Sequence, residues 1–88
     1  MILVAGPLDG LEIGERIELI RKRNGLSKKE LADILNISVQ TLTNYETNKT
    51  VPSLDTICAM ATALGVTMNM IVHGREPKKE QKPLITSD

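Results

Sequence analysis

The sequence LSKKELADILNISVQTLTNY, residues 26–45, predicts two short helices joined by a tight turn. Ser27, followed three residues later by Glu30, forms a capping box, a pattern with which helices begin. The apolar residues after it recur at the spacing of one helix face: Leu31, Ile34 and Leu35. Asn36 then tolerates the left-handed conformation that ends many helices. We therefore expect the first helix over residues 28–35.

The second helix of this stretch is expected over residues 39–46. Ser38 can cap its start, and Leu42 and Tyr45 lie on one inner face at i and i+3. The remaining side chains are mostly small or carry an amide, and they lie away from that face: Val39, Gln40, Thr43 and Asn44. The helix therefore leaves an uncharged polar surface on its outside.

These outward residue types suit the major groove of double-stranded DNA. The amides of Gln40 and Asn44 carry a donor beside an acceptor, which matches the edge of adenine. The methyl groups of Thr43 and Val39 can meet the methyl group of thymine. Two helices joined by a short turn, with the second helix exposed, are typical of the helix-turn-helix.

Length and composition restrict the class of protein. The chain has 88 residues, 41% of them hydrophobic and 1% aromatic, which suits one small domain with an aliphatic core. Such a core favours an all-α bundle over a sheet sandwich. No apolar run reaches the length of a membrane span, and MILVAGPLDG at the start lacks the basic region of a signal peptide. A single cysteine, Cys58, excludes an internal disulfide framework and is compatible with a reducing cytoplasm.

The charges of the chain are balanced in number but unevenly distributed. Lys and Arg number 11, as do Asp and Glu, and a net charge of zero does not favour nucleic acid as a partner. Residues 21–29, however, hold five basic residues and no acidic one. Acidic residues precede this stretch: Asp9, Glu12, Glu15 and Glu18. The basic stretch is either an ordinary solvated face, which charge alone favours, or a surface that faces DNA.

Apolar periodicity predicts three further helices, over residues 13–23, 54–64 and 68–72. The inner face of the first is expected to hold Ile13, Ile17 and Ile20. The inner face of the second is expected to hold Leu54, Ile57, Ala61 and Leu64. Residues 1–11 are predicted to be irregular, with a short strand at 2–5, and residues 75–88 to be a disordered tail. Residues 12–74 would then form the folded domain.

Two features of these helices have more than one interpretation. Cys58 lies beside the expected inner stripe, and we interpret it as a small buried hydrophobe, since no basic residue near it in sequence would lower its pKa for redox chemistry. The helix over 68–72 carries four apolar residues: Met68, Met70, Ile71 and Val72. They either complete the core or form a dimer interface, and we favour the interface because so short a helix cannot bury all four. The N-terminal MILVAG could serve the same purpose.

From Ile13 to Val72 the chain resembles the lambda-repressor-like, Cro/C1-type (XRE) helix-turn-helix DNA-binding domains. Three stretches carry the resemblance: IGERIELIRKRNGLSKKELADILNIS, QTLTNYETNK and VPSLDTICAMATALGV. The resemblance implies a compact five-helix bundle whose second and third helices form the helix-turn-helix.

The resemblance also implies roles for individual residues. It assigns base contacts to Val39, Gln40, Thr43 and Asn44. It assigns phosphate contacts to Lys28, Ser38, Asn48, Lys49 and Thr50, with the loop after the third helix approaching through its backbone amides. Arg21 and Glu46 stand where the family has an ion pair, so we expect a structural pair there. Arg is common in the family where Val39 or Asn44 stands here, and its absence implies A·T-rich sites without an Arg–guanine contact.

The sequence therefore predicts sequence-specific binding of double-stranded DNA by a small, repressor-type transcriptional regulator that acts as a cytoplasmic homodimer. We expect no enzymatic activity, because no combination of nucleophile, base and orienting group is present. We also expect no cofactor, metal or small-molecule substrate. A protein-interaction or antitoxin-like module with the same fold stays open as an alternative, since the net charge is zero. Salt dependence separates the two, because groove binding weakens steeply as salt rises.

Overall fold

The computed structural model describes residues 10–75 and confirms the all-α fold. In this part of the chain the helices are α2 (Ile13–Arg23), α3 (Lys28–Leu35), α4 (Val39–Glu46), α5 (Leu54–Leu64) and α6 (Met68–His73). The first four have the expected bounds, and α6 ends one residue later than predicted. The expected strand at 2–5 lies outside the described residues, as does nearly all of the expected tail.

Polar caps explain why the helices begin and end at these residues. Ser27, Ser38, Ser53 and Thr67 each accept a hydrogen bond from a backbone amide three residues later. Ser27 and Glu30 form the complete capping box. Asn36 ends α3 with φ 60° and ψ 43°, the left-handed conformation expected of it. These local bonds satisfy backbone groups that a helix end would otherwise leave without a partner.

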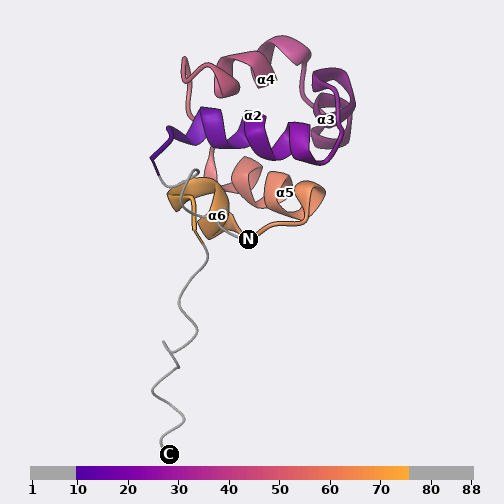
Figure 1. Ribbon diagram of the computed structural model, residues 1–88. Coiled ribbons are helices and arrows are strands. Elements are labelled where there is room, and N and C mark those ends of the chain that lie inside the picture. Colours follow the sequence, from indigo (N-terminus) through magenta and orange to yellow (C-terminus); the bar gives the residue numbers. More distant parts are fainter. Residues whose placement is uncertain (1–9, 76–88) are drawn as a thin grey trace, which may run out of the picture.

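The helices enclose one aliphatic core. α2 runs through the middle of the bundle, with α4 on one side and α5 and α6 on the other (Figure 1). Each helix contributes one large, fully buried side chain: Ile17, Leu31, Leu42, Met60 and Ile71. Around them pack partly buried side chains that include Met68, Met70 and Val72 of α6. The short helix therefore places all four of its apolar residues against its own domain, which favours the core interpretation over the dimer interface.

Three of the expected core positions are wrong. Ile34 is 56% exposed and Leu54 is 69% exposed, and Cys58 also faces solvent. On α5 the inner face is Ile57, Met60, Ala61 and Leu64, a full i, i+3, i+4, i+7 stripe. Leu54 and Cys58 are four residues apart and lie together on the solvent-facing side that flanks this stripe. On α3 the buried pair is Leu31 and Ala32, because α3 packs between α4 and α5, and this rotates Ile34 outward.

A buried arginine that the sequence analysis passed over joins α2 to α6. Arg16 is 5% exposed, and its Nε donates to the backbone oxygen of Ile71 at 2.7 Å. Its Nη1 and Nη2 donate to the backbone oxygens of Leu11 and Val72. The guanidinium thereby satisfies carbonyl groups in the last turn of α6, which have no partner within the helix. Arg16 lies four residues before Ile20 on the buried side of α2. This spacing could have indicated from the sequence that Arg16 is buried.

The close approach of α2 and α4 depends on a glycine. A Cβ atom at Gly14 would lie 2.2 Å from the backbone oxygen of Tyr45 and 2.8 Å from that of Glu46. The Gly14 amide donates to Asn48 Oδ1 at 2.9 Å. Asn48 presents this oxygen from a left-handed backbone with φ 64°. The start of α2 therefore rests directly on the C-terminal end of α4.

Replacing Gly14 with Ala tests this contact. Alanine in a helix would ordinarily stabilise the protein by about 0.5–1 kcal/mol relative to glycine. Here we expect the opposite sign, a loss of about 1–3 kcal/mol, because backbone atoms must move. Urea unfolding gives the free energy. Gly10→Ala is the control, since nothing lies within 4 Å of its added Cβ. A Gly14→Ala protein as stable as the wild type would contradict the packing described.

Candidate nucleic-acid interface

The outward side of α4 is formed by the four residues expected to read bases. Leu42 and Glu46 are the buried residues of this helix. Val39 is 43% exposed, Gln40 is exposed, and Thr43 and Asn44 are half-buried. We call this group, Val39, Gln40, Thr43 and Asn44, the α4 face. Ser38, exposed at the start of α4, uses its hydroxyl to accept from the Thr41 amide at 3.0 Å.

The two amides of the α4 face are bonded to each other. Gln40 Nε2 donates to Asn44 Oδ1 at 3.0 Å. The bond spans one turn of helix and leaves the Gln40 oxygen and the Asn44 Nδ2 group available to other partners. An acceptor and a donor thus lie side by side on the surface, the combination that adenine requires in the major groove.

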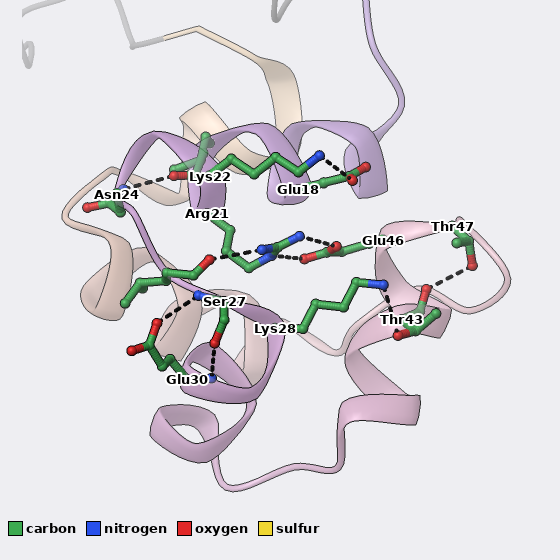
Figure 2. Close-up of polar contacts among 12 residues, drawn as sticks. Glu18, Arg21, Lys22, Asn24, Ser27, Lys28, Glu30, Thr43, Glu46 and Thr47 are labelled. Carbon is green, nitrogen blue, oxygen red and sulfur yellow. Dashed lines mark hydrogen bonds and ion pairs between the residues drawn. The ribbon is translucent and has the colours of Figure 1, made fainter.

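A lysine from α3 reaches the same surface. Lys28 Nζ lies 3.4 Å from Thr43 Oγ1, and Figure 2 shows its side chain extended from α3 toward α4. The backbone of Thr43 is also bonded beyond the end of α4, since its carbonyl oxygen accepts from Thr47 Oγ1 at 2.8 Å. Lys28 therefore places a positive charge next to the uncharged α4 face.

The loop after α4 uses its backbone amides within the protein. The amides of Lys49 and Thr50 donate to the backbone oxygen of Asn44 at 2.8 and 3.2 Å. The Asn48 amide donates to Tyr45 O at 3.1 Å, and its side-chain oxygen accepts from Gly14. These bonds close the end of α4. Contact of this loop with a phosphate would therefore come from side-chain groups on exposed residues: the Asn48 Nδ2 group, the Lys49 ammonium and the Thr50 hydroxyl.

A buried ion pair fixes α4 against α2. Arg21 Nε lies 2.7 Å from Glu46 Oε2, and Arg21 Nη2 lies 3.1 Å from Glu46 Oε1. The side chains are 7% and 2% exposed, and the remaining nitrogen, Nη1, donates to the Leu26 carbonyl at 2.9 Å. The two-pronged pair, drawn at the centre of Figure 2, ties α4 to α2, and the bond to Leu26 ties α2 to the turn that precedes α3.

The ion pair also affects the ionisation of Arg21. Because Arg21 donates hydrogen bonds to the Glu46 carboxylate, the pKa of the guanidinium is raised, and this outweighs the opposite effect of burial. Because the pKa is higher in the folded protein than in the unfolded chain, the pair stabilises the fold fully at every pH below the pKa of the unfolded arginine. The stabilisation is lost only in strong alkali. The α2–α4 contact therefore keeps its charged arginine throughout the neutral range.

The basic residues around this surface fall into two groups. Lys22 pairs with Glu18 at 3.0 Å and Lys29 pairs with Asp33 at 3.3 Å, both in exposed i, i+4 pairs on their own helices. Within residues 10–75, no carboxylate forms an ion pair with Lys28 or Lys49. Lys28 of α3 and Lys49 beyond the end of α4 thus carry positive charges that no carboxylate of the described residues pairs with.

Other kinds of site are not seen in the described part of the chain. Residues 10–75 contain no group of three or more His, Cys, Asp or Glu side chains arranged to hold a metal ion. None of the helices in that range combines the length and apolar character that crossing a membrane requires.

Comparison with known sequences places this surface in context. A family model described as helix-turn-helix (HTH_3) matches residues 17–71. The chain is 36% identical over 72 residues to the immunity repressor protein of Bacillus phage phi105, covering 82% of this chain and 50% of the relative. It is 33% identical over 66 residues to the HTH-type transcriptional regulator DdrOP3 of Deinococcus deserti, covering 75% and 51%. The chain thus spans about half the length of these curated relatives.

Solved structures show the same arrangement of helices. The crystal structure of SinR, the master regulator for biofilm formation, in complex with DNA matches with a TM-score of 0.63 and 30% identity, over 67% of this chain and 95% of that one. The P22 c2 repressor in complex with a synthetic operator matches with a TM-score of 0.70 and 23% identity, over 74% and 98%. The second likeness, at this identity, shows the fold alone.

Glu46→Gln tests the buried ion pair. The glutamine would leave the buried Arg21 without an opposite charge, at a cost of about 3–5 kcal/mol in the free energy of unfolding. Glu18→Gln is the matched control, since it breaks the exposed pair with Lys22 and should cost less than about 1 kcal/mol. The double variant Arg21→Met/Glu46→Leu should recover part of the loss. Equal costs for the two glutamine variants in urea unfolding would show that Glu46 is not a structural anchor.

Proposed function

The chain belongs to the Cro/C1-type (XRE) helix-turn-helix family, and on this basis we propose that it binds specific sequences of double-stranded DNA and represses transcription. The single observation that carries the proposal is the α4 face. Its amides and methyl groups have the chemistry of base readers, while Leu42 and the Arg21–Glu46 pair hold the helix from its inner side. In the solved complex, the relative SinR is bound to DNA.

In this proposal α4 enters the major groove and the residues around it contact the backbone. Gln40 and Asn44 face adenine, and Val39 and Thr43 face thymine methyl groups. Phosphates are contacted by Ser38 at the start of α4 and by Asn48, Lys49 and Thr50 beyond its end. Positive charge comes from Lys28 and Lys49, which have no competing carboxylate in the described residues.

We further propose that the protein acts as a homodimer in the cytoplasm, with residues 12–74 as the DNA-binding domain. One α4 helix reads only a few base pairs, and two copies on half-sites one DNA turn apart give a longer site. An exposed apolar pair directly after the phosphate-contacting loop supports an interface there: Val51 is 72% exposed and Leu54 is 69% exposed.

Selection of bound sites from a random duplex pool tests the function. We expect the wild type to enrich a two-fold symmetric motif containing A·T pairs, and Gln40→Ala/Asn44→Ala to lose the preference at those pairs, by about 5- to 150-fold for each lost base contact. Thr62→Ala, on the exposed side of α5, should behave as the wild type. If the folded wild type enriches no sequence, the DNA-binding proposal fails and a protein partner becomes the target of search.

Salt dependence tests the phosphate contacts separately. Lys49→Ala should weaken binding to all duplexes by a similar factor, because a phosphate contact carries no base information. It should also reduce the slope of log affinity against log salt by about 1. Lys29→Ala is the control, since Lys29 is paired with Asp33. An unchanged slope for Lys49→Ala, measured by fluorescence anisotropy at several salt concentrations, would remove Lys49 from the interface.

A further inference from the structure

The ammonium group of Lys28 lies at the α4 face. Its Nζ atom is 3.4 Å from the hydroxyl oxygen, Oγ1, of Thr43, which is a residue of the α4 face. Both residues are half-buried, and the lysine crosses from α3 to α4 to make the contact (Figure 2). The side chain of the next residue, Lys29, instead stays along α3, where its Nζ lies 3.3 Å from Asp33 Oδ2. The position of the Lys28 charge is thus set by α4.

Hydrogen bonding by Lys28 is incomplete within the described residues. A lysine ammonium has three N–H donors and no acceptor. Residues 10–75 supply it with Thr43 as an acceptor, and with no carboxylate in an ion pair. Two donors therefore stay available on a side chain that already lies against the outward surface of α4.

The chemistry of the α4 face lacks what Lys28 supplies. The residues of α4 are VQTLTNYE, without Lys or Arg. Guanine presents two acceptors, O6 and N7, in the major groove, and Lys or Arg is the usual donor to both. The bonded amides of Gln40 and Asn44 present one acceptor and one donor, which suits adenine. Lys28 therefore adds to the α4 face a positively charged donor of the kind that binds guanine.

We propose that Lys28 is a specificity-determining residue that contacts a guanine in the major groove, next to the A·T pair faced by Gln40 and Asn44. Thr43 acts as its positioning residue, because its hydroxyl holds the ammonium over the α4 face. The inference rests on the proposed DNA-binding function and changes one assignment, since the family resemblance implies a phosphate contact for Lys28. It also predicts that each half-site of the DNA contains a G·C pair in addition to its A·T pairs.

Binding of the full chain to its enriched duplex, and to duplexes with each base pair replaced in turn, tests the proposal. Lys28→Ala should lose the preference for one G·C pair by about 5- to 150-fold and keep the preference at other positions. Lys28→Gln should shift that position toward A·T, because glutamine matches adenine. Replacing the guanine with 7-deazaguanine should weaken wild-type binding but not that of Lys28→Ala.

Lys49→Ala is the matched comparison for a phosphate contact. If Lys28→Ala, like Lys49→Ala, weakens binding uniformly and reduces the salt slope by about 1, the guanine contact is overturned. The guanine contact would also be overturned if the enriched motif contained no G·C pair whose preference changes in Lys28→Ala. Thr43→Val keeps a methyl group but loses the hydroxyl, so it should reduce the same G·C preference in the wild type and cause no further loss of that preference in Lys28→Ala. If the wild type selects no motif at all, the proposed function itself fails, which is a distinct result.

Discussion

The position of α4 depends on the buried ion pair between Arg21 and Glu46. Two short bonds join the side chains, and a third bond from Arg21 reaches the chain just before α3. Gly14 lets α2 come close enough for this geometry, since any side chain there would meet the backbone of α4. Removing one charge would leave the other buried without compensation, which costs far more than losing an exposed pair. The fold thus fixes α4 from its inner side and leaves its outer side free for a ligand.

Buried arginines do structural work at two points in this small core. Each of the five described helices has one fully buried large side chain, each of which contributes about 1.5–3 kcal/mol. Arg16 joins α2 to the end of α6, and Arg21 joins α2 to the end of α4. Both guanidinium groups bond to carbonyl or carboxylate oxygens at helix ends, where short helices have unsatisfied groups. α2 therefore organises the domain, although it does not belong to the helix-turn-helix.

Helix bounds were predictable from sequence because they depend on local chemistry. Ser27, Ser38 and Ser53 cap the helices that follow them, and apolar spacing fixed the helix type. The orientation of a helix depends on its neighbours, and there the prediction failed for Ile34 and Leu54. The composition of the α4 face followed from the sequence, whereas its bonds did not. The reach of Lys28 to Thr43 depends on how α3 crosses α4, which spacing along the chain cannot show.

The central claim is that the α4 face, held by the Arg21–Glu46 pair, is the surface that meets DNA. The most direct measurement is a nuclear magnetic resonance titration of the full chain with its enriched duplex, following backbone amides and the side-chain amides of Gln40 and Asn44. The account predicts the largest shifts at residues 38–50 and at Lys28, with little change on α6. Shifts concentrated on α5 and α6, with the amides of Gln40 and Asn44 unchanged, would contradict it.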